Sequence, residues 1–334
     1  MLKRWNTIFM TGNLPPGEVA GPELDLVSRW LLITRFCVMP MTLFAGLIGG
    51  LLALYQRDAV DWSAWTLAVI GLLLAHITNN MANDLLDWWQ GVDTSDYPRA
   101  TYAPHPIRDK LISPTGLIVA VLVTILADFV IALALTELRG WLVMGFAIAG
   151  IVLSLGYVAP PLSLKRRGLG ELVVLIVWGP LMIGGAYLSA TGHLPAWVLW
   201  ASLPYGLLVT CVLLGKHIDK LEYDLPKGVY TLPVLLGDST ARLFTRGALA
   251  LFFLVTVFEV AFGVLPLACL LVVLGVPRLV QVDKAFQKPK PYEQPAELPI
   301  WPLWFAAAAF LVVRAGGGAF VLGLILGAIW PFSL

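Results

Sequence analysis

Charged residues are scarce in this chain: Asp, Glu, Lys and Arg together make up only 13% of its 334 residues. Soluble globular domains carry about 25% of such residues, whereas 59% of the residues here are hydrophobic. The formal net charge is only +1, so the overall charge balance says nothing about nucleic-acid or acidic partners. This composition excludes a soluble globular protein and favours a membrane protein. For a membrane protein we expect no nucleic-acid partner.

Cysteine is also rare, with three residues in the whole chain. Cys37, Cys211 and Cys269 all lie in apolar stretches and show no CxxC spacing, which is typical of buried free thiols rather than of disulfides or a zinc site. Near the N-terminus, Lys3 and Arg4 are not followed by a short apolar region with a small-residue cleavage site. We therefore expect no cleaved signal peptide.

Long apolar runs, in contrast, are abundant, and most are close to the roughly 20 residues that a helix needs to cross a bilayer. They predict an all-α, polytopic membrane bundle of nine helices, or of ten if Arg314 and Gly316–Gly318 divide the last run. We expect a cytoplasmic lead-in over residues 1–26 and a single membrane domain over residues 27–334. The expected spans are Leu31–Tyr55, Trp65 to about Asp87, Pro114–Leu135, Trp141–Val158, Leu172–Ser189, Trp197–Leu214, Arg246–Gly263, Pro266–Val280 and Trp301–Trp330.

Lys and Arg are distributed unevenly among the loops between these spans, and this bias sets the orientation of a membrane protein. If the N-terminus is inside, the outer loops between spans one to eight hold only Arg57 and Arg139, whereas the inner loops hold many more. The asymmetry predicts a cytoplasmic N-terminus. We expect a multi-pass protein of the inner (plasma) membrane of a prokaryote, surrounded by membrane lipids.

A polar cluster closes the second span, where Asn80, Asp84 and Asp87 follow one another at i, i+4 and i+7. On a helix this spacing puts them on one face, with Asn83 beside them. Carboxylates are costly at the end of a membrane helix unless they face a cation or a water-filled cavity. Oxygen ligands of this kind suit Mg2+, which leaves positions for substrate phosphates. We therefore interpret Asn83, Asp84 and Asp87 as metal ligands, and Asn80 as a diphosphate contact.

A second polar stretch, Lys216 to Arg242, follows the sixth span on the same side of the membrane. Its acids are Asp219, Glu222 and Asp224, and converging carboxylates repel one another unless a cation lies between them. The two clusters together could hold one or two Mg2+ ions. We assign the catalytic role to the acids Asp84, Asp87, Asp219 and Asp224, with Glu222 as a further metal ligand.

Basic residues accompany both clusters and could bind phosphate oxygens that the metal leaves uncovered; these are Arg99, Arg108, Lys165, Arg166, Lys216 and Lys220. A diphosphate at the membrane surface, attached to a tail among the helices, fits both sets of charges. Ionisation of an allylic diphosphate requires charge neutralisation on the leaving group. The allylic cation would be sheltered by apolar and aromatic walls, with Trp88, Trp89 or Tyr157 as cation–π partners.

Structural roles stay open for some of these basic residues. Charged residues in inner loops are often only solvated, and Arg166 and Arg167 could serve only to set the topology. Arg29 and Arg35, at the mouth of the first span, could reach the membrane surface or meet an anion.

Three sequence motifs follow one another along the chain: Asn80-x-x-Asn83-Asp84-x-x-Asp87 with Gly91-x-Asp93, Tyr157-x-x-Pro160-Pro161-x-Ser163-Leu164 with Gly168-Leu169-Gly170-Glu171, and Asp224-x-x-x-Gly228-x-x-Thr231-Leu232-Pro233. In this order they resemble the UbiA superfamily of intramembrane prenyltransferases. The resemblance is closest to the branch that prenylates dihydroxynaphthoate for menaquinone, and it runs from about Arg29 to Gly237.

The resemblance implies nine helices around a central cavity, with two aspartate-rich motifs on the cytoplasmic side that bind Mg2+ and an isoprenyl diphosphate. By position, Asp84 and Asp87 take the metal role of the first motif, and Asp224 is the last acid of the second. The family spaces the acids of its second motif as DxxxD, and Lys220 stands where the earlier acid is expected. Either neighbouring acid, at position 219 or 222, could replace it.

We therefore predict a Mg2+-dependent prenyltransferase that moves an isoprenyl group from its diphosphate to a lipophilic or aromatic acceptor, expected to be a quinone-precursor ring. One alternative is a terpene cyclase of the same superfamily, which ionises the diphosphate without an acceptor. Another is a transporter or lipid-binding protein, which Asp128, Glu259 and Arg314 inside apolar stretches would suit. Transporters usually bind at the membrane midplane, whereas the polar clusters here lie at the inner surface. The prenyl chain length and the oligomeric state stay open.

Overall fold

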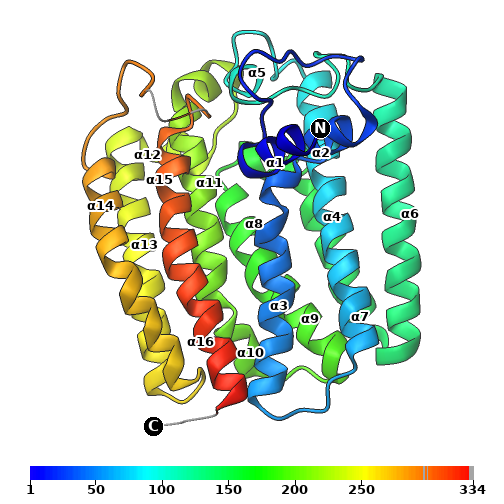
Figure 1. Ribbon diagram of the computed structural model, residues 1–334, viewed down its shortest axis with the longest axis vertical. Helices are drawn as coiled ribbons and strands as arrows, with labels where there is room; N and C mark the ends of the chain where they lie inside the picture. Colours follow the sequence, from blue (N-terminus) through cyan, green and yellow to red (C-terminus); the bar gives the residue numbers. More distant parts are fainter. Residues whose placement is uncertain (296–297, 299, 331–334) are drawn as a thin grey trace.

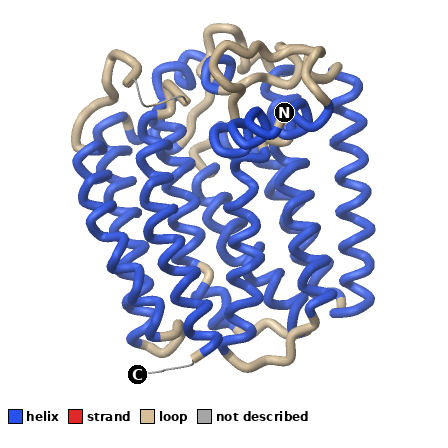
Figure 2. Tube along the Cα trace, in the orientation of Figure 1, coloured by secondary structure: helices blue, strands red, loops and turns tan. Residues whose placement is uncertain are grey.

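The computed structural model describes residues 1–295, 298 and 300–330, and within that part of the chain it contains helices and loops but no strand (Figure 2). The prediction of an all-α bundle is confirmed. The long helices stand side by side, with α1 (Leu2–Thr11) and α2 (Leu26–Ile33) lying across one end of the bundle (Figure 1). Residues 331–334 of the expected membrane domain lie outside the described residues.

Eight helical segments are long and apolar enough to cross a membrane. Five of them are single helices: α4 (Trp62–Trp89), α6 (Pro114–Arg139), α7 (Trp141–Val158), α13 (Asp238–Ala261) and, with a short 3-10 turn η1 (Phe36–Val38), α3 (Met39–Tyr55). The other three combine several elements: α8 (Gly170–Ile176), η3 (Val177–Leu181) and α9 (Met182–Thr191); α10 (Ala196–Ala201), α11 (Leu203–Asp224) and η4 (Leu225–Lys227); α15 (Trp304–Val312), η6 (Val313–Gly317) and α16 (Gly318–Ile329).

A ninth helix runs the height of the bundle beside α13 (Figure 1). It consists of the 3-10 segment η5 (Leu267–Gly275) and the α-helix α14 (Val276–Phe286). The last apolar stretch does not divide into two spans, because Arg314 and its glycines form a wide π turn, η6, inside one continuous helical run. The count is therefore nine, and the option of ten is not supported in the described part of the chain.

The expected first span, Leu31–Tyr55, begins too early. Helix α2 ends at Ile33, and Arg35 adopts a left-handed backbone conformation with φ 52° before the membrane helix begins at Phe36. Such a conformation is uncommon for a residue with a side chain. It breaks the chain direction, so that α2 lies across the end of the bundle while α3 enters it.

Two helices extend past the ends that the apolar runs suggested. Helix α4 has 28 residues and is about 42 Å long at 1.5 Å per residue, longer than a hydrocarbon core of about 30 Å. Helix α11 continues to Asp224 instead of ending near Leu214. Both polar clusters are therefore carried on rigid helix ends, at the end of the bundle where α1 and α2 lie.

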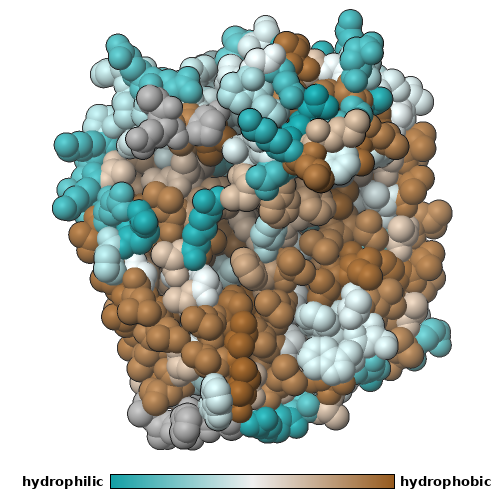
Figure 3. Space-filling view, in the orientation of Figure 1, coloured by the Kyte–Doolittle hydropathy of each residue, from teal (hydrophilic) through white to brown (hydrophobic). Residues whose placement is uncertain are grey.

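The outer surface suits a lipid environment. Apolar side chains cover the middle and lower part of the visible face, and polar side chains gather at its upper end (Figure 3). In α6 only 17% of the apolar window is buried inside the protein, and Leu122 and Leu126 are among its exposed side chains. Because so much apolar surface would be unfavourable in water, the chain is an integral multi-pass membrane protein.

Close approach between helices is made possible by small residues. At Gly215 of α11, an added Cβ would come within 2.6 Å of the Phe305 backbone in α15. At Gly49 of α3, it would come within 2.6 Å of the Ile183 carbonyl oxygen in α9. Short elements complete the polar end of the bundle: α5 (Arg99–Tyr102), η2 (Leu164–Arg166) and α12 (Leu232–Leu236).

Candidate active site

A cavity of about 510 Å³ lies among α4, α6, α7, α9 and α11. Its wall is apolar over most of its length, with Ile131, Phe146 and Leu181 among the lining residues. Its charged and amide-bearing lining residues are Arg35, Asn79, Asn80, Asn83, Asp87, Asp93, Arg99, Asp128, Lys165, Lys216 and Lys220. All of these except Asp128 belong to the polar clusters or to the loops and helix ends beside them, so the cavity joins a charged chamber to an apolar tunnel.

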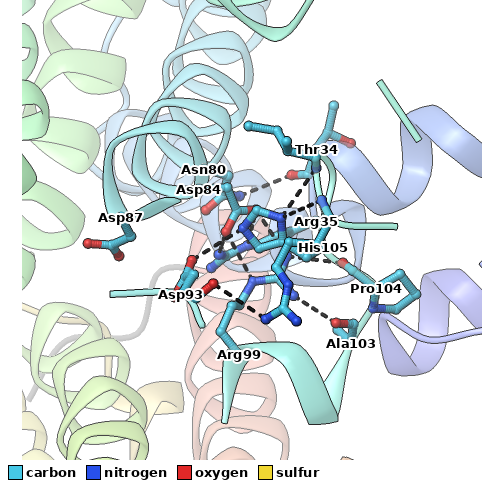
Figure 4. A network of polar contacts seen from close by, with 12 residues as sticks. Thr34, Arg35, Asn80, Asp84, Asp87, Asp93, Arg99, Ala103, Pro104 and His105 are labelled. Carbon is cyan, nitrogen blue, oxygen red and sulfur yellow. Dashed lines mark hydrogen bonds and ion pairs between the residues drawn. The ribbon is translucent and has the colours of Figure 1, made fainter. Parts of the chain in front are cut away.

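Asp84 is fully buried behind this chamber and binds two guanidinium groups (Figure 4). Arg99 donates from Nε to Oδ1 and from Nη2 to Oδ2, both at 3.0 Å, and Arg35 donates to the same carboxylate. Burial disfavours the Arg99 cation, but the Asp84 carboxylate more than compensates and raises the pKa of this guanidinium above its usual value. The three side chains form one buried ionic network.

Asp87 points away from that network (Figure 4) and lines the cavity. Both of its oxygens accept hydrogen bonds from Lys165 Nζ, at 2.9 and 2.7 Å. The contact ties α4 to the short helix η2, and both side chains are nearly fully buried. The loop after the fourth long helix thus supplies a cation to the first acidic cluster, whereas the sequence predicted Lys165 as a diphosphate contact.

The loop after α4 adds a further acid and a histidine to this region. Donor atoms of Asp84, Asp93 and His105 lie within 4.8 Å of one another, and all three residues are buried. Burial raises the pKa of the Asp93 carboxyl, but the His105 ring and the Arg99 guanidinium together outweigh that rise and lower the pKa below its ordinary value. His105 Nε2 lies 3.3 Å from Asp93 Oδ2 without forming a well-aligned hydrogen bond, so neither atom has a hydrogen-bond partner among the described residues.

The second polar cluster meets the chamber through lysines. Lys220 Nζ donates to the hydroxyl of Tyr97 at 2.6 Å, and Tyr97 in turn donates to Asp224. Lys220 also lies 3.5 Å from Asp224 Oδ1. Lys216, one turn earlier, lines the cavity and forms no salt bridge with any acid that the structure describes.

The structure does not bring the remaining predicted acids of this cluster to the cavity. Asp219 accepts hydrogen bonds from the backbone N–H groups of Phe305 and Ala306, at 3.0 and 2.9 Å, and so binds the first turn of α15. Glu222 is exposed on the outer side of α11. Neither side chain lines the cavity with Asp87. The prediction from the sequence that two complete clusters of acids face one another is therefore wrong.

The other predicted contacts are divided between the cavity and its surroundings. Asn83 and Tyr157 line the cavity, as does Asn80, whose amide donates to the Thr34 carbonyl oxygen at 3.0 Å. Trp88 is half-buried outside the cavity lining. Arg108 donates to the Asp93 backbone oxygen at 3.4 Å and also lies outside the lining.

Several residues at the site had no role assigned from the sequence. Arg35, named only as a cation near the first span, binds Asp84 across 49 positions. Tyr97 joins Lys220 to Asp224, and a buried Glu171–His217 pair lies at 2.6 Å beside the cavity. The Gly91-x-Asp93 motif was the available signal for Asp93. Arg35 and Tyr97 carry no local pattern that would have identified their partners.

The residues of the first cluster fit a divalent cation of the Mg2+ type. Asn83 and Asp87 supply oxygen donors at the cavity wall, and Asp93 contributes a buried oxygen without a hydrogen-bond partner among the described residues. Hard oxygen donors of this kind suit Mg2+. Asp84, whose oxygens are bound by guanidinium groups, lies directly behind them.

Curated relatives extend over most of the chain. It is 24% identical over 84% of its length to the UbiA prenyltransferase domain-containing protein 1 homolog of Drosophila melanogaster, covering 77% of that protein. It is 30% identical over 66% of its length to the 1,4-dihydroxy-2-naphthoate octaprenyltransferase of Escherichia coli (strain K12), covering 72% of that protein. Relatives therefore occur in both eukaryotes and bacteria.

Solved structures share the fold at low sequence identity. The apo UbiA homolog from Aeropyrum pernix K1 superposes with a TM-score of 0.60 at 16% identity, covering 85% of this chain and 98% of that one. The UbiA homolog from Archaeoglobus fulgidus bound to GPP and Mg2+ gives a TM-score of 0.51 at 14% identity, covering 87% and 99%. The family model described as the UbiA prenyltransferase family matches residues 41–296. This match covers most of the helical bundle and both polar clusters, and the chain belongs to the UbiA prenyltransferase family.

Proposed function

We propose that this protein transfers an isoprenyl group from an isoprenyl diphosphate to a lipophilic aromatic acceptor, with a quinone-precursor ring as the acceptor. The observation that carries the proposal is the single cavity that joins a chamber of buried charges to an apolar tunnel. A diphosphate fits the first part and a hydrocarbon tail the second. Two relatives also support this assignment: one is named as a naphthoate octaprenyltransferase, and one fold neighbour was solved with GPP and Mg2+.

The cations of the chamber bind the diphosphate in this proposal. Lys216 is the most available, because it lines the cavity without an acidic partner among the described residues. Lys165 and Lys220 also line the cavity, each with one buried acid beside it. Charge-assisted hydrogen bonds to phosphate oxygens are stronger than neutral ones, so these ammonium groups orient the leaving group at the mouth of the tunnel.

Asn83, Asp87 and Asp93 are the residues that would hold Mg2+, and Asp84 lies behind them. When bound, this ion would neutralise charge that develops on the diphosphate as it leaves. Arg99 and Arg35 hold the Asp84 carboxylate in place from behind. Because Asp84 and Asp87 are each paired with buried cations, the chamber keeps a defined geometry before substrate binds.

In the chemical step the allylic C–O bond breaks, its electron pair leaves with the diphosphate, and a ring carbon of the acceptor forms the new C–C bond and loses a proton. The apolar wall keeps water away from the allylic cation. Tyr157 lines the same cavity and is placed to stabilise that cation through its ring. The acceptor enters from the membrane, in keeping with its lipophilic character.

We further propose that the polar end of the bundle faces the cytoplasm of a prokaryotic cell and that residues 27–334 act as one catalytic domain. The support is the excess of Lys and Arg at this end, together with the origin of the cavity lining, to which the first 26 residues contribute only Thr11 and Gly12.

The proposal is tested with purified protein, a prenyl diphosphate, Mg2+ and a dihydroxynaphthoate-type acceptor. We expect Asp87→Asn and Lys216→Met to lower prenyl transfer at least 100-fold, because each removes charge from the cavity wall. The control variant Glu222→Gln, which changes an exposed acid of α11 outside the cavity, keeps wild-type activity.

Asp87→Ala or Asp84→Ala protein that consumed the diphosphate at the wild-type rate would contradict the proposal. Release of a cyclised hydrocarbon or alcohol without an acceptor would instead support the terpene cyclase. Gas chromatography with mass spectrometry of the extracted products separates these two outcomes.

A further inference from the structure

Helix α11 turns a single stripe of residues toward the cavity. Its lining members recur at intervals of three or four positions, which is the spacing of one helix face: Val209, Val212, Leu213, Lys216, His217 and Lys220. The charged end of this stripe carries two ammonium groups one turn apart. No carboxylate from α11 lies in the cavity lining within the described residues.

The acids of α11 are each committed elsewhere or lie off the stripe. Asp219 binds two backbone N–H groups of α15, and Glu222 is on the exposed side. Asp224 continues the stripe one turn beyond Lys220, but it is fully buried and accepts a hydrogen bond from Tyr97. The part of the cavity lining that α11 contributes therefore presents cations, whereas the part that α4 contributes includes the acid Asp87.

Lys220 is held rigidly in this position. Its ammonium group lies 2.6 Å from the Tyr97 hydroxyl, 3.5 Å from Asp224 Oδ1 and 4.8 Å from the centre of the Tyr97 ring. The side chain is only 7% exposed and belongs to the cavity lining. Fixing a long lysine side chain is entropically costly, so several contacts are needed to hold one positive charge in a defined place.

We propose that the Lys220 ammonium, fixed by Tyr97 and Asp224, is a built-in cation that replaces a second divalent metal ion on the α11 side of the diphosphate site. The inference rests on the proposed function. The proposed diphosphate site is asymmetric: the α4 cluster holds one divalent ion, and the Lys220 ammonium supplies the positive charge on the α11 side. A covalently attached cation is present at any metal concentration, so binding of the diphosphate then requires one metal ion.

The number of metal ions tests this inference without a turnover assay. The probe is Mn2+, titrated into purified protein saturated with a non-ionisable prenyl S-thiolodiphosphate, and the bound ion is counted by electron paramagnetic resonance. We expect one Mn2+ per wild-type chain and a hyperbolic titration. Two Mn2+ per wild-type chain would overturn the inference.

Variants at position 220 test whether the Lys220 ammonium takes the place of the second metal ion. Lys220→Asp restores a carboxylate to the cavity stripe, and we expect it to bind a second Mn2+. Lys220→Met keeps one Mn2+ and binds the analogue at least tenfold more weakly in calorimetry. Lys284→Asp, which makes the same charge change at an exposed position of α14, serves as the control and leaves both measurements unchanged.

The outcomes also separate this inference from the proposed function. Wild-type protein that binds no prenyl thiolodiphosphate in calorimetry would overturn both. Analogue binding with two Mn2+ ions, or Lys220→Met protein with unchanged affinity for the analogue, would overturn only the role of Lys220. If Lys220→Asp does not fold, the wild-type count and Lys220→Met still decide the result.

Discussion

At the residue scale, the site is organised by buried charges that neutralise one another. Asp84 is paired with Arg35 and Arg99, and Asp87 is paired with Lys165. A carboxylate removed from water is tolerated only when it is paired and hydrogen-bonded. The sequence predicted which acids gather at the end of α4, because their spacing is a local property. It did not predict that Arg35 belongs to the same network, since nothing near position 35 points to Asp84.

Removal of one member of this network leaves a buried charge without its best partner. We expect Arg99→Met to destabilise the fold by about 3–5 kcal/mol, the usual cost of breaking a buried ion pair. Replacing all three charges, with Asp84→Asn, Arg35→Met and Arg99→Met together, should recover much of that loss, because no buried charge is then left without a partner. Thermal unfolding in detergent measures both variants. A triple variant that is less stable than Arg99→Met alone would contradict this account.

At the element scale, one carboxylate joins α1 to α2 through hydrogen bonds, beside the apolar packing of Ile8. Asp25 caps α2 by accepting from Ser28 N at 2.9 Å, and it also accepts from Trp5 Nε1 and from Arg4 Nη1, both at 3.0 Å. The hydrogen bond from the Ser28 hydroxyl is the largest of the interactions that lower the pKa of Asp25 below its ordinary value. A residue of the segment that the sequence predicted only as a cytoplasmic lead-in is thus the junction of two surface helices.

The attachment of α1 is expected to weaken in acid. The pKa of Asp25 is lower in the folded protein than in the unfolded chain. The ionised carboxylate therefore stabilises the contact between α1 and α2 fully at pH values above the ordinary pKa of about 4. This stabilisation is lost as the pH falls through the pKa of the folded protein. Limited proteolysis between α1 and α2, followed from pH 7 to pH 3, should accelerate below about pH 4 in the wild type. Asp25→Asn protein should be cleaved readily at every pH. Equal protection of this variant and the wild type at pH 7 would exclude the role of Asp25.

The helix boundaries show where local pattern was sufficient and where it was not. The bounds of α7 and the first residue of α6 agree with the apolar runs. Helix α11 was expected to end near Leu214, but it continues because its polar end packs against α15 and the Tyr97 loop. Tertiary contacts of this kind stabilise helical backbone that hydropathy alone does not identify.

At the scale of the whole molecule, nine helices are an odd number of crossings, and an odd number places the two ends of the chain at opposite ends of the bundle. Helices α1 and α2 lie at the end that carries the charged chamber, and α16 finishes at the other end (Figure 1). The loop between α9 and α10, which contains His193, lies at the end of the bundle opposite the C-terminal end of α11, whose last turn contains Glu222 (Figure 1). The proposed orientation therefore predicts that position 193 lies outside the cell and position 222 inside it.

Single cysteines test the orientation in intact bacterial cells that express the protein. In a background in which Cys37, Cys211 and Cys269 are replaced by Ser, we expect His193→Cys to react with a membrane-impermeant maleimide added outside. Glu222→Cys should react only after the cells are opened. The reverse pattern would place the charged chamber on the outer side.

The sequence by itself determined that this is a helical membrane protein, and it identified which polar residues accompany its helix ends. Run length, composition and the spacing of Asn80, Asp84 and Asp87 are properties of short segments, so no knowledge of the fold is needed to interpret them. The tertiary structure decided which of these groups share a site. The rotation of α11 and the positions of Tyr97 and Phe305 turn Lys220 into the cavity and Asp219 away from it. The orientation of these two side chains depends on contacts between residues 86 to 123 positions apart in the sequence. Such contacts form only when the helices pack against one another.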